Sequence, residues 1–156
     1  MAFPIEDFKQ ALGRYASGVV VVAVMTDDGP VGFTCQSFSS LSLTPPLVMF
    51  AAAVDGNSWS KMRSVSAVGI SVLGHDDEAV AVQFATSGID KFAGVAWHLA
   101  PNGAPLMTGA CAHVSGQASA STTYGDHDLV VVAVDALAFE DSEPFVYYRG
   151  QFRRLA

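Results

Sequence analysis

The sequence carries little charge, and the charge it has is mostly negative. Only 15% of the 156 residues are charged, and 15 acidic against 8 basic side chains give a net charge of −7. An acidic chain is poorly suited to phosphate backbones and to anionic lipid, so we expect no nucleic-acid partner and no membrane partner. Because 51% of the residues are hydrophobic, such a low charge also indicates that a second subunit covers part of the surface.

Long apolar runs, a secretion signal and a set of paired cysteines are also missing. The longest apolar runs, Val19–Met25 and Leu47–Val54, fall well short of the roughly 20 residues that cross a bilayer. The first residues, MAFPIEDF, contain neither a basic region nor an apolar stretch of a signal peptide. The only two cysteines, Cys35 and Cys111, are therefore expected to be reduced thiols in a cytoplasmic protein.

Several common catalytic and nucleotide-binding motifs are absent. The sequence has no GxSxG, no P-loop and no GxGxxG fingerprint. The four histidines lack partners at metal-ligand spacing, so we expect no metal. Cys35 alternates inward with Val31 and Phe33, which favours a structural thiol over a nucleophile.

The patterns that are present predict one domain, residues 1–156, built as a small antiparallel barrel of about seven strands. Alternating or β-branched runs predict strands over Gly18–Met25, Val31–Gln36, Leu47–Val54, Ala67–Leu73, Ala110–Ser121, His127–Phe139 and Phe145–Leu155. Apolar periodicity predicts helices over Phe8–Tyr15, from the cap Asn57-Ser58 to Val65, and over His75–Phe84. Thr86–Gly109 is predicted to be a long irregular segment with one short strand, Val95–Leu99, and such loops are usually functional.

The segment GFTCQSFSSLSLTPP, residues 32–46, combines a strand with a Ser-rich turn that stops at Pro45-Pro46. Hydroxyls and backbone N–H groups beside apolar side chains suit a ligand with a flat apolar part and polar edges. The alternative is a turn whose hydroxyls satisfy only their own backbone.

The segment YGDHD, residues 124–128, precedes a strong strand. Gly125 permits an unusual backbone, and Asp126 can orient or charge-pair with the imidazole of His127. A histidine placed there can hydrogen-bond a ligand amide. The alternative is an ordinary hairpin turn with a surface histidine.

Five segments occur in order along nearly the whole chain: GRYASGVVVV, GFTCQSFSSLSLTPPLVMF, DKFAGVAWH, GDHDLVVVAV and PFVYYRGQFRRL. Together they resemble the flavin reductase family of FMN-binding split barrels, the small reductase partners of two-component flavin-dependent monooxygenases, over roughly residues 7–153. The resemblance implies a mainly β, Greek-key split barrel with a few short flanking helices, and a homodimer with flavin at the subunit interface. Family members often carry a second Ala or Thr where this chain has Cys35-Gln36.

The resemblance also implies the site. The flavin ring is expected against one segment, whose backbone meets its N5, O4 and N3 edge: Thr34, Cys35, Gln36, Ser37, Phe38, Ser39 and Ser40. The remaining cofactor-binding residues are Ala51, Ala52 and Ala53 along the ribityl chain, Asn57 and Ser58 at the phosphate, Phe84, Ala85, Lys91 and Phe92 near the phosphate or adenosine, and Tyr148 and Arg149 near the nicotinamide nucleotide. His127 matches the histidine that contacts the nicotinamide, and it is expected to orient the carboxamide without acting as acid or base.

The expected activity is therefore that of an NAD(P)H:flavin oxidoreductase that reduces FAD or FMN and passes reduced flavin to a monooxygenase partner. With only 8 Lys and Arg and no evident Arg pair for a 2′-phosphate, NADH is favoured over NADPH. Two alternatives stay open from the sequence. One is a flavin- or haem-binding carrier on the same barrel without reductase activity, and the other is a structural module with an empty barrel.

Overall fold

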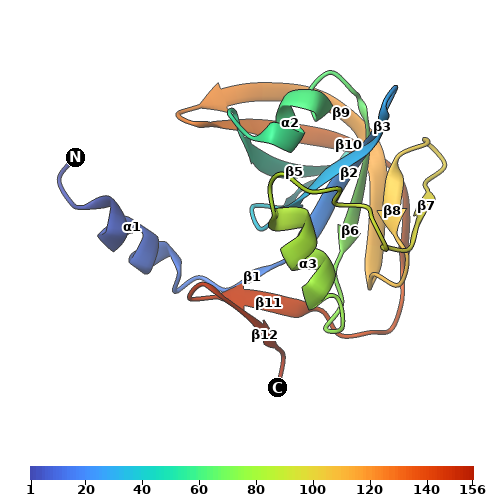
Figure 1. Cartoon of the computed structure of the whole chain (residues 1–156). Coiled ribbons are helices and arrows are strands. Elements are labelled where there is room, and N and C mark those ends of the chain that lie inside the picture. The colour runs from blue at the N-terminus through green and yellow to red at the C-terminus, as the bar shows by residue number, and fades with distance from the viewer.

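The computed structural model describes residues 1–156, and a seven-stranded antiparallel sheet forms its body (Figure 1). The strand order is β3-β2-β6-β9-β10-β5-β4. The bounds are β2 Val20–Thr26, β3 Gly29–Cys35, β4 Ser39–Leu43, β5 Pro46–Ala53, β6 Ala67–Val72, β9 Ala112–Tyr124 and β10 His127–Phe139. Although β3 and β5 stand far apart in this order, they contact each other, and Phe33 and Phe50 pack edge-to-face at 6.1 Å between ring centroids. The sheet therefore curls into a barrel, as predicted.

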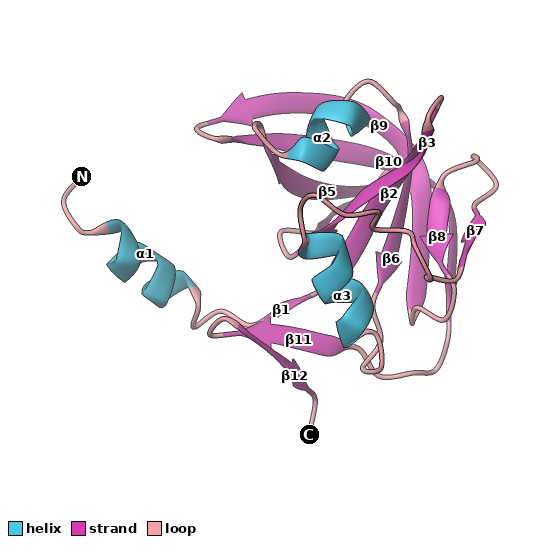
Figure 2. Ribbon diagram, in the orientation of Figure 1, coloured by secondary structure: helices cyan, strands magenta, loops and turns pink.

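Smaller elements surround the barrel (Figure 2). A three-stranded sheet joins β1 (Ser17–Gly18), β11 (Phe145–Tyr148) and β12 (Gln151–Arg154), and a two-stranded sheet joins β7 (Trp97–Leu99) and β8 (Pro105–Met107). Helices α2 (Asn57–Met62) and α3 (Glu78–Ala85) both pack on β3. Helix α1 (Ile5–Leu12) projects away from the barrel beyond the β1–β11–β12 sheet. None of the three helices combines the length and the apolarity that crossing a membrane requires.

Strand β2 lies between two hydrophobic cores, which explains its unbroken apolar sequence. Val20, Val22 and Val24 face the barrel interior, where they join a cluster that includes Phe50 and Val130. The alternate residues face a second cluster outside the barrel, and this cluster is made of Val19, Val21, Ala23, Leu73, Ala81, Phe84, Met107, Ala110 and Phe145. Helix α3 is therefore held to the barrel by its buried face, Ala81 and Phe84.

The serine-rich segment differs from the prediction. Ser39–Leu43 forms an edge strand, β4, that pairs with β5 through Ser39–Met49 and Leu43–Pro46, so it is not a turn. Proline has no N–H to donate to the ladder, so it is tolerated as the first residue of a strand. Pro46 is accordingly the first residue of β5, and the chain turns at Thr44-Pro45.

Two other segments and the helices also depart from the predicted elements. Helix α2 ends at Met62 where Val65 was expected, and α3 begins at Glu78 where His75 was expected. Phe145–Leu155 is a hairpin, because the chain turns at Arg149 and Gly150 with positive φ angles of 51° and 75°. Thr86–Gly109 contains two paired strands, β7 and β8, where one was expected. Helix α1 ends at Leu12, where Gly13 caps it, so Tyr15 lies outside the helix. No residue of α1 is buried within this chain.

Candidate functional site

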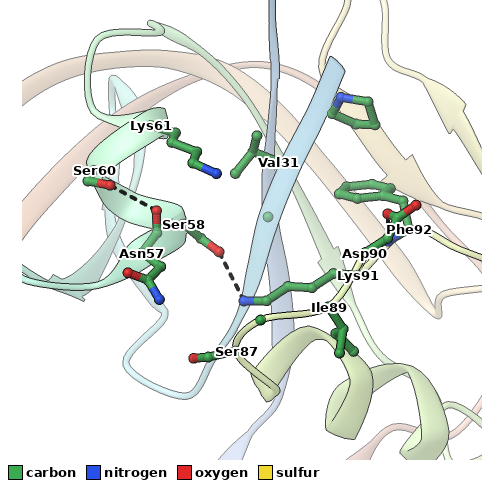
Figure 3. A pocket seen from close by; sticks show the side chains of 13 residues that line it. Val31, Asn57, Ser58, Ser60, Lys61, Ser87, Ile89, Asp90, Lys91 and Phe92 are labelled. Carbon is green, nitrogen blue, oxygen red and sulfur yellow. Dashed lines mark hydrogen bonds between the residues drawn. The ribbon is translucent and has the colours of Figure 1, made fainter. Parts of the chain in front are cut away.

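A polar pocket opens between α2, the start of β3 and the loop after α3 (Figure 3). Its volume is about 440 Å³, and only three of its 13 lining residues are hydrophobic. The lining residues are Pro30, Val31 and Gly32 from β3, Asn57, Ser58, Ser60 and Lys61 from α2, and Ser87, Gly88, Ile89, Asp90, Lys91 and Phe92 from the loop. Such a lining suits the polar, charged end of a ligand better than an aromatic ring.

Lys91 and Ser58 meet across this pocket. The Lys91 Nζ donates a hydrogen bond to Ser58 Oγ at 2.9 Å, and thereby connects the loop to α2 (Figure 3). Lys91 is half-buried, and burial lowers the pKa of its ammonium group. Lys61, also on α2, lines the same pocket. Two ammonium groups, serine hydroxyls and the Asn57 amide form a donor set that fits a phosphate.

Helix α2 is held in place by an interaction behind the pocket. Its Trp59 is buried, and the indole Nε1 donates to Asp128 Oδ2 at 2.8 Å. Thr123 Oγ1 donates to Asp128 Oδ1 at 2.6 Å. Both bonds lower the pKa of the Asp128 carboxyl, and the bond from Thr123 has the larger effect. The helix begins at Asn57 with Gly56 as its N-cap, so the predicted Asn57-Ser58 cap is wrong by one position.

A second group of predicted residues gathers at the end of β5. The Ser37 hydroxyl accepts from the Ala51 N–H at 2.8 Å and donates to the Ala51 carbonyl at 3.0 Å. Cys35 Sγ lies 3.1 Å from the same hydroxyl, and burial raises the pKa of this thiol. Ser37 therefore connects the end of β3 to β5, and its hydroxyl already makes hydrogen bonds to the protein backbone. The structure confirms that Cys35 is buried.

His127 lies beside this group. It begins β10 and stands opposite Ala53 of β5. Its Nδ1 is 2.7 Å from Asp126 Oδ1, which confirms the predicted pairing of these two side chains. His127 lowers the pKa of Asp126, mainly through this hydrogen bond and to a smaller extent through its charge. The side chain is about half exposed, and Nε2 has no hydrogen-bond partner within the chain.

The remaining ring-segment residues divide into exposed and inward-facing side chains. Gln36 and Ser40 are exposed, and Ser39 Oγ donates to the Ser40 carbonyl. Phe38 packs against the core of the barrel. Thr34 donates its hydroxyl to the Ala81 carbonyl. The side chains of Thr34 and Phe38 are therefore engaged within the protein, although both residues are only partly buried.

Two further predicted positions have side chains directed elsewhere. Ala52 is buried in the barrel core, whereas Ala51 and Ala53 are half-buried. Phe84 is fully buried, with its ring 4.8 Å from that of Phe92, and Ala85 is the exposed last residue of α3. Phe84 thus does not line the pocket but packs against Phe92, which does.

The structure brings most, but not all, of the predicted residues together. Because β5 runs through Val54–Gly56 directly into α2, the group around Ser37 and His127 is continuous along the chain with the polar pocket. Tyr148 and Arg149 lie at the β11–β12 turn instead. The Arg149 guanidinium stacks over the Tyr148 ring at 5.2 Å, and the Arg149 N–H donates to the Gly13 carbonyl at 3.0 Å. Neither residue lines the polar pocket.

Sequence reasoning missed Lys61, the β3 residues of the pocket and the loop residues 87–90. Lys61 lies three positions after Ser58, so helical spacing places both on one face. No local pattern marks Pro30–Gly32, because the β3 wall of the pocket depends on how α2 and α3 pack against it.

Comparison with known proteins defines the class. Residues 12–156 match the family described as "Flavin reductase like domain", and the chain belongs to this family. The chain is 34% identical over 93% of its length, and 75% of the relative's length, to the reductase subunit HsaB of a flavin-dependent monooxygenase from Rhodococcus jostii.

An NADH:FMN oxidoreductase of Rhodococcus qingshengii is 35% identical, over 95% of this chain and 80% of that protein. Among solved structures, the NADH:FAD oxidoreductase SgcE6 of Streptomyces globisporus, in complex with NAD and FAD fragments, superposes with a TM-score of 0.93. It is 32% identical, and the match covers 97% of this chain and 93% of that one. The predicted split-barrel fold is thereby confirmed.

Proposed function

We propose that this protein is an NADH:flavin oxidoreductase that supplies reduced flavin to a flavin-dependent monooxygenase. Family membership supports the reaction, and the activities named for its relatives support NADH as the donor. The observation in the structure that carries the proposal is the polar pocket, where Lys61, Lys91 and Ser58 lie together as groups suited to a phosphate.

The proposed flavin lies along β5. Its phosphate binds in the polar pocket at Asn57, Ser58 and Lys91, and its ribityl chain follows Ala51–Ala53. The ring then lies against the backbone of residues 36–40. The geometry supports this order, because the Ser37–Ala51 hydrogen bonds place the ring segment at the end of β5 that leads into α2. The pocket itself, with few hydrophobic residues, leaves the ring outside it.

Flavin and NADH supply the chemistry of the reaction, a hydride transfer from nicotinamide C4 to flavin N5. The protein then needs to hold the two rings near contact distance at a productive angle. Backbone N–H groups of residues 36–40 stabilise negative charge at the ring edge. Asp126 fixes the orientation of His127, whose Nε2 is then available to hold the nicotinamide carboxamide. No side chain has to transfer a proton in this step.

The flavin is proposed to bind as an exchangeable substrate that leaves to serve the oxygenase. Relatives named for FMN and for FAD are about equally similar to this chain, so both are candidate substrates. For the donor we retain NADH, which both names specify. The free thiols Cys35 and Cys111 are compatible with the proposed cytoplasmic location.

We also propose that the protein is a homodimer. Helix α1 supports this, because its apolar Phe8 and Leu12 are 44% and 58% exposed. The ring that stacks on Phe8, that of Phe3, is itself exposed. A second protomer would also supply Tyr148 and Arg149, which lie away from the polar pocket of their own chain. Phe8→Glu is expected to lower the mass measured by analytical ultracentrifugation to that of a monomer. Gln10→Glu adds the same charge to the same helix and is expected to leave the mass unchanged.

The activity is tested by mixing catalytic amounts of protein with NADH and FMN or FAD and following the nicotinamide absorbance. Rapid, enzyme-dependent loss of absorbance supports the reductase. A bound flavin without turnover would instead identify a carrier, and no binding at all would identify a structural module.

A further inference from the structure

Gln83, near the end of α3, holds the pocket loop through both hydrogens of its side-chain amide. Its Nε2 donates to the Lys91 carbonyl and to the Ala93 carbonyl, each at 2.8 Å. The acceptors lie 8 and 10 residues further along the chain. The two bonds therefore fix the backbone on both sides of Phe92, the segment that carries Lys91 into the polar pocket.

Other interactions hold this segment less directly. Within the loop, the Phe92 N–H donates to Asp90 Oδ1 at 3.1 Å, and the Ala93 N–H donates to the Asp90 carbonyl at 3.3 Å. These bonds are local and do not attach the loop to α3. The packing of Phe92 against Phe84 does attach the loop to α3. An apolar ring contact has no donor and acceptor, however, so it constrains the orientation of the neighbouring backbone less than a hydrogen bond does. The directional attachment at Lys91 is the Gln83 amide.

We propose that Gln83 is a positioning residue that directs Lys91 toward the phosphate of the flavin, and so determines the preference for phosphorylated flavins over riboflavin. This inference rests on the proposed function. Gln83 itself does not line the polar pocket, so it acts through Lys91 only. With the Lys91 backbone fixed, the ammonium group is kept beside Ser58, at the point where the phosphate binds.

Only an uncharged side chain of this length with two N–H donors meets this requirement. Glutamate has a similar shape but is an acceptor, so it would place a carboxylate against two carbonyl oxygens. Methionine fills a similar volume without donors. Asparagine retains the amide but is one methylene shorter, so it reaches fewer of the acceptors.

The test measures dissociation constants for FMN and for riboflavin by quenching of flavin fluorescence, in wild type, Gln83→Met, Lys91→Met and the double variant. Gln83→Met is expected to weaken FMN binding roughly tenfold, as the loss of about one hydrogen bond's net worth would, and to change riboflavin binding by less than about twofold. In the Lys91→Met background, Gln83→Met is expected to add no further loss for FMN, because interacting residues are not additive.

The control is Thr86→Val, which removes the bond from Thr86 Oγ1 to the Val82 carbonyl at the same end of α3. It is expected to leave the ratio of FMN to riboflavin affinity unchanged. Thermal unfolding verifies that each variant folds. If Gln83→Met does not fold, Gln83→Asn is used in its place.

Equal weakening of FMN and riboflavin in Gln83→Met would overturn the inference, as would additive losses in the double variant. Such results would leave the proposed function intact, provided that the wild type still oxidises NADH with flavin. A wild type that neither binds flavin nor oxidises NADH would instead refute the proposed function.

Discussion

Replacing Lys91 by methionine tests the phosphate end of the proposed site. The substitution keeps the length of the apolar stem and removes the ammonium group that donates to Ser58 Oγ at 2.9 Å. Because an apolar stem of similar length remains at this half-buried position, we expect the variant to fold. What it loses is a positive charge in a half-buried pocket.

The magnitude follows from Coulomb's law. Two unit charges about 4 Å apart interact by about 4 kcal/mol at an effective dielectric constant near 20. Lys91 is only half-buried, and Lys61 remains in the pocket, so solvent and the second cation reduce the loss to about 2 kcal/mol. This corresponds to an increase of about 30-fold in the dissociation constant for FMN.

Steady-state NADH oxidation with FMN and with riboflavin is the assay. KM for FMN is expected to rise by about 30-fold while kcat at saturating FMN stays within about twofold, since binding to the phosphate is uniform along the reaction. Riboflavin has no phosphate, so its KM is expected to stay unchanged. An equal rise in KM for both flavins, or no rise for FMN, would refute the placement of the phosphate at Lys91.

Other predictions concern the nicotinamide side, the buried carboxylate and close backbone packing. His127→Ala is expected to raise KM for NADH and to leave KM for FMN unchanged; an unchanged KM and rate for NADH would remove this residue from the site. The pKa of Asp128 is lowered from an ordinary value near 3.8, so its contribution to stability is complete above that pH and is lost as pH falls through the lower pKa of the folded state. The difference in unfolding free energy between wild type and Asp128→Asn should therefore shrink on acidification, and a difference independent of pH would contradict this. Gly69→Ala places a Cβ 2.4 Å from the backbone oxygen of Pro105 and should destabilise by about 3 kcal/mol in chemical denaturation. Gly18→Ala, which meets nothing within 4 Å, should change stability by less than about 0.5 kcal/mol, and an equal effect of both would contradict the packing argument.

The barrel was predictable from sequence because its strands are set by local patterns. Val20–Met25 is apolar on both faces, and the alternation of Val31, Phe33 and Cys35 matches their burial against one core. Ser39–Leu43 was misjudged because its polar composition is that of a turn, while its strand conformation comes from pairing with β5. Edge pairing of this kind is a tertiary effect that a local pattern does not contain.

The site was predictable only in part, for a similar reason. The sequence singled out Ser58, Lys91 and His127, which lie in recognisable motifs. It did not indicate that the Ser37 hydroxyl bonds to Ala51, nor that Gln83 holds the Lys91 loop, since these contacts join segments that are distant in the chain. Such contacts depend on the packing of helices and strands against one another.

The flavin phosphate is proposed to bind between α2 and the loop after α3. A crystal structure of the protein grown with FMN and NAD⁺ tests it most directly. We predict that the phosphate oxygens lie within hydrogen-bonding distance of Ser58 Oγ and Lys91 Nζ, with the ring against residues 36–40. A structure in which Ser58 and Lys91 remain bonded to each other while the flavin binds elsewhere would contradict the claim.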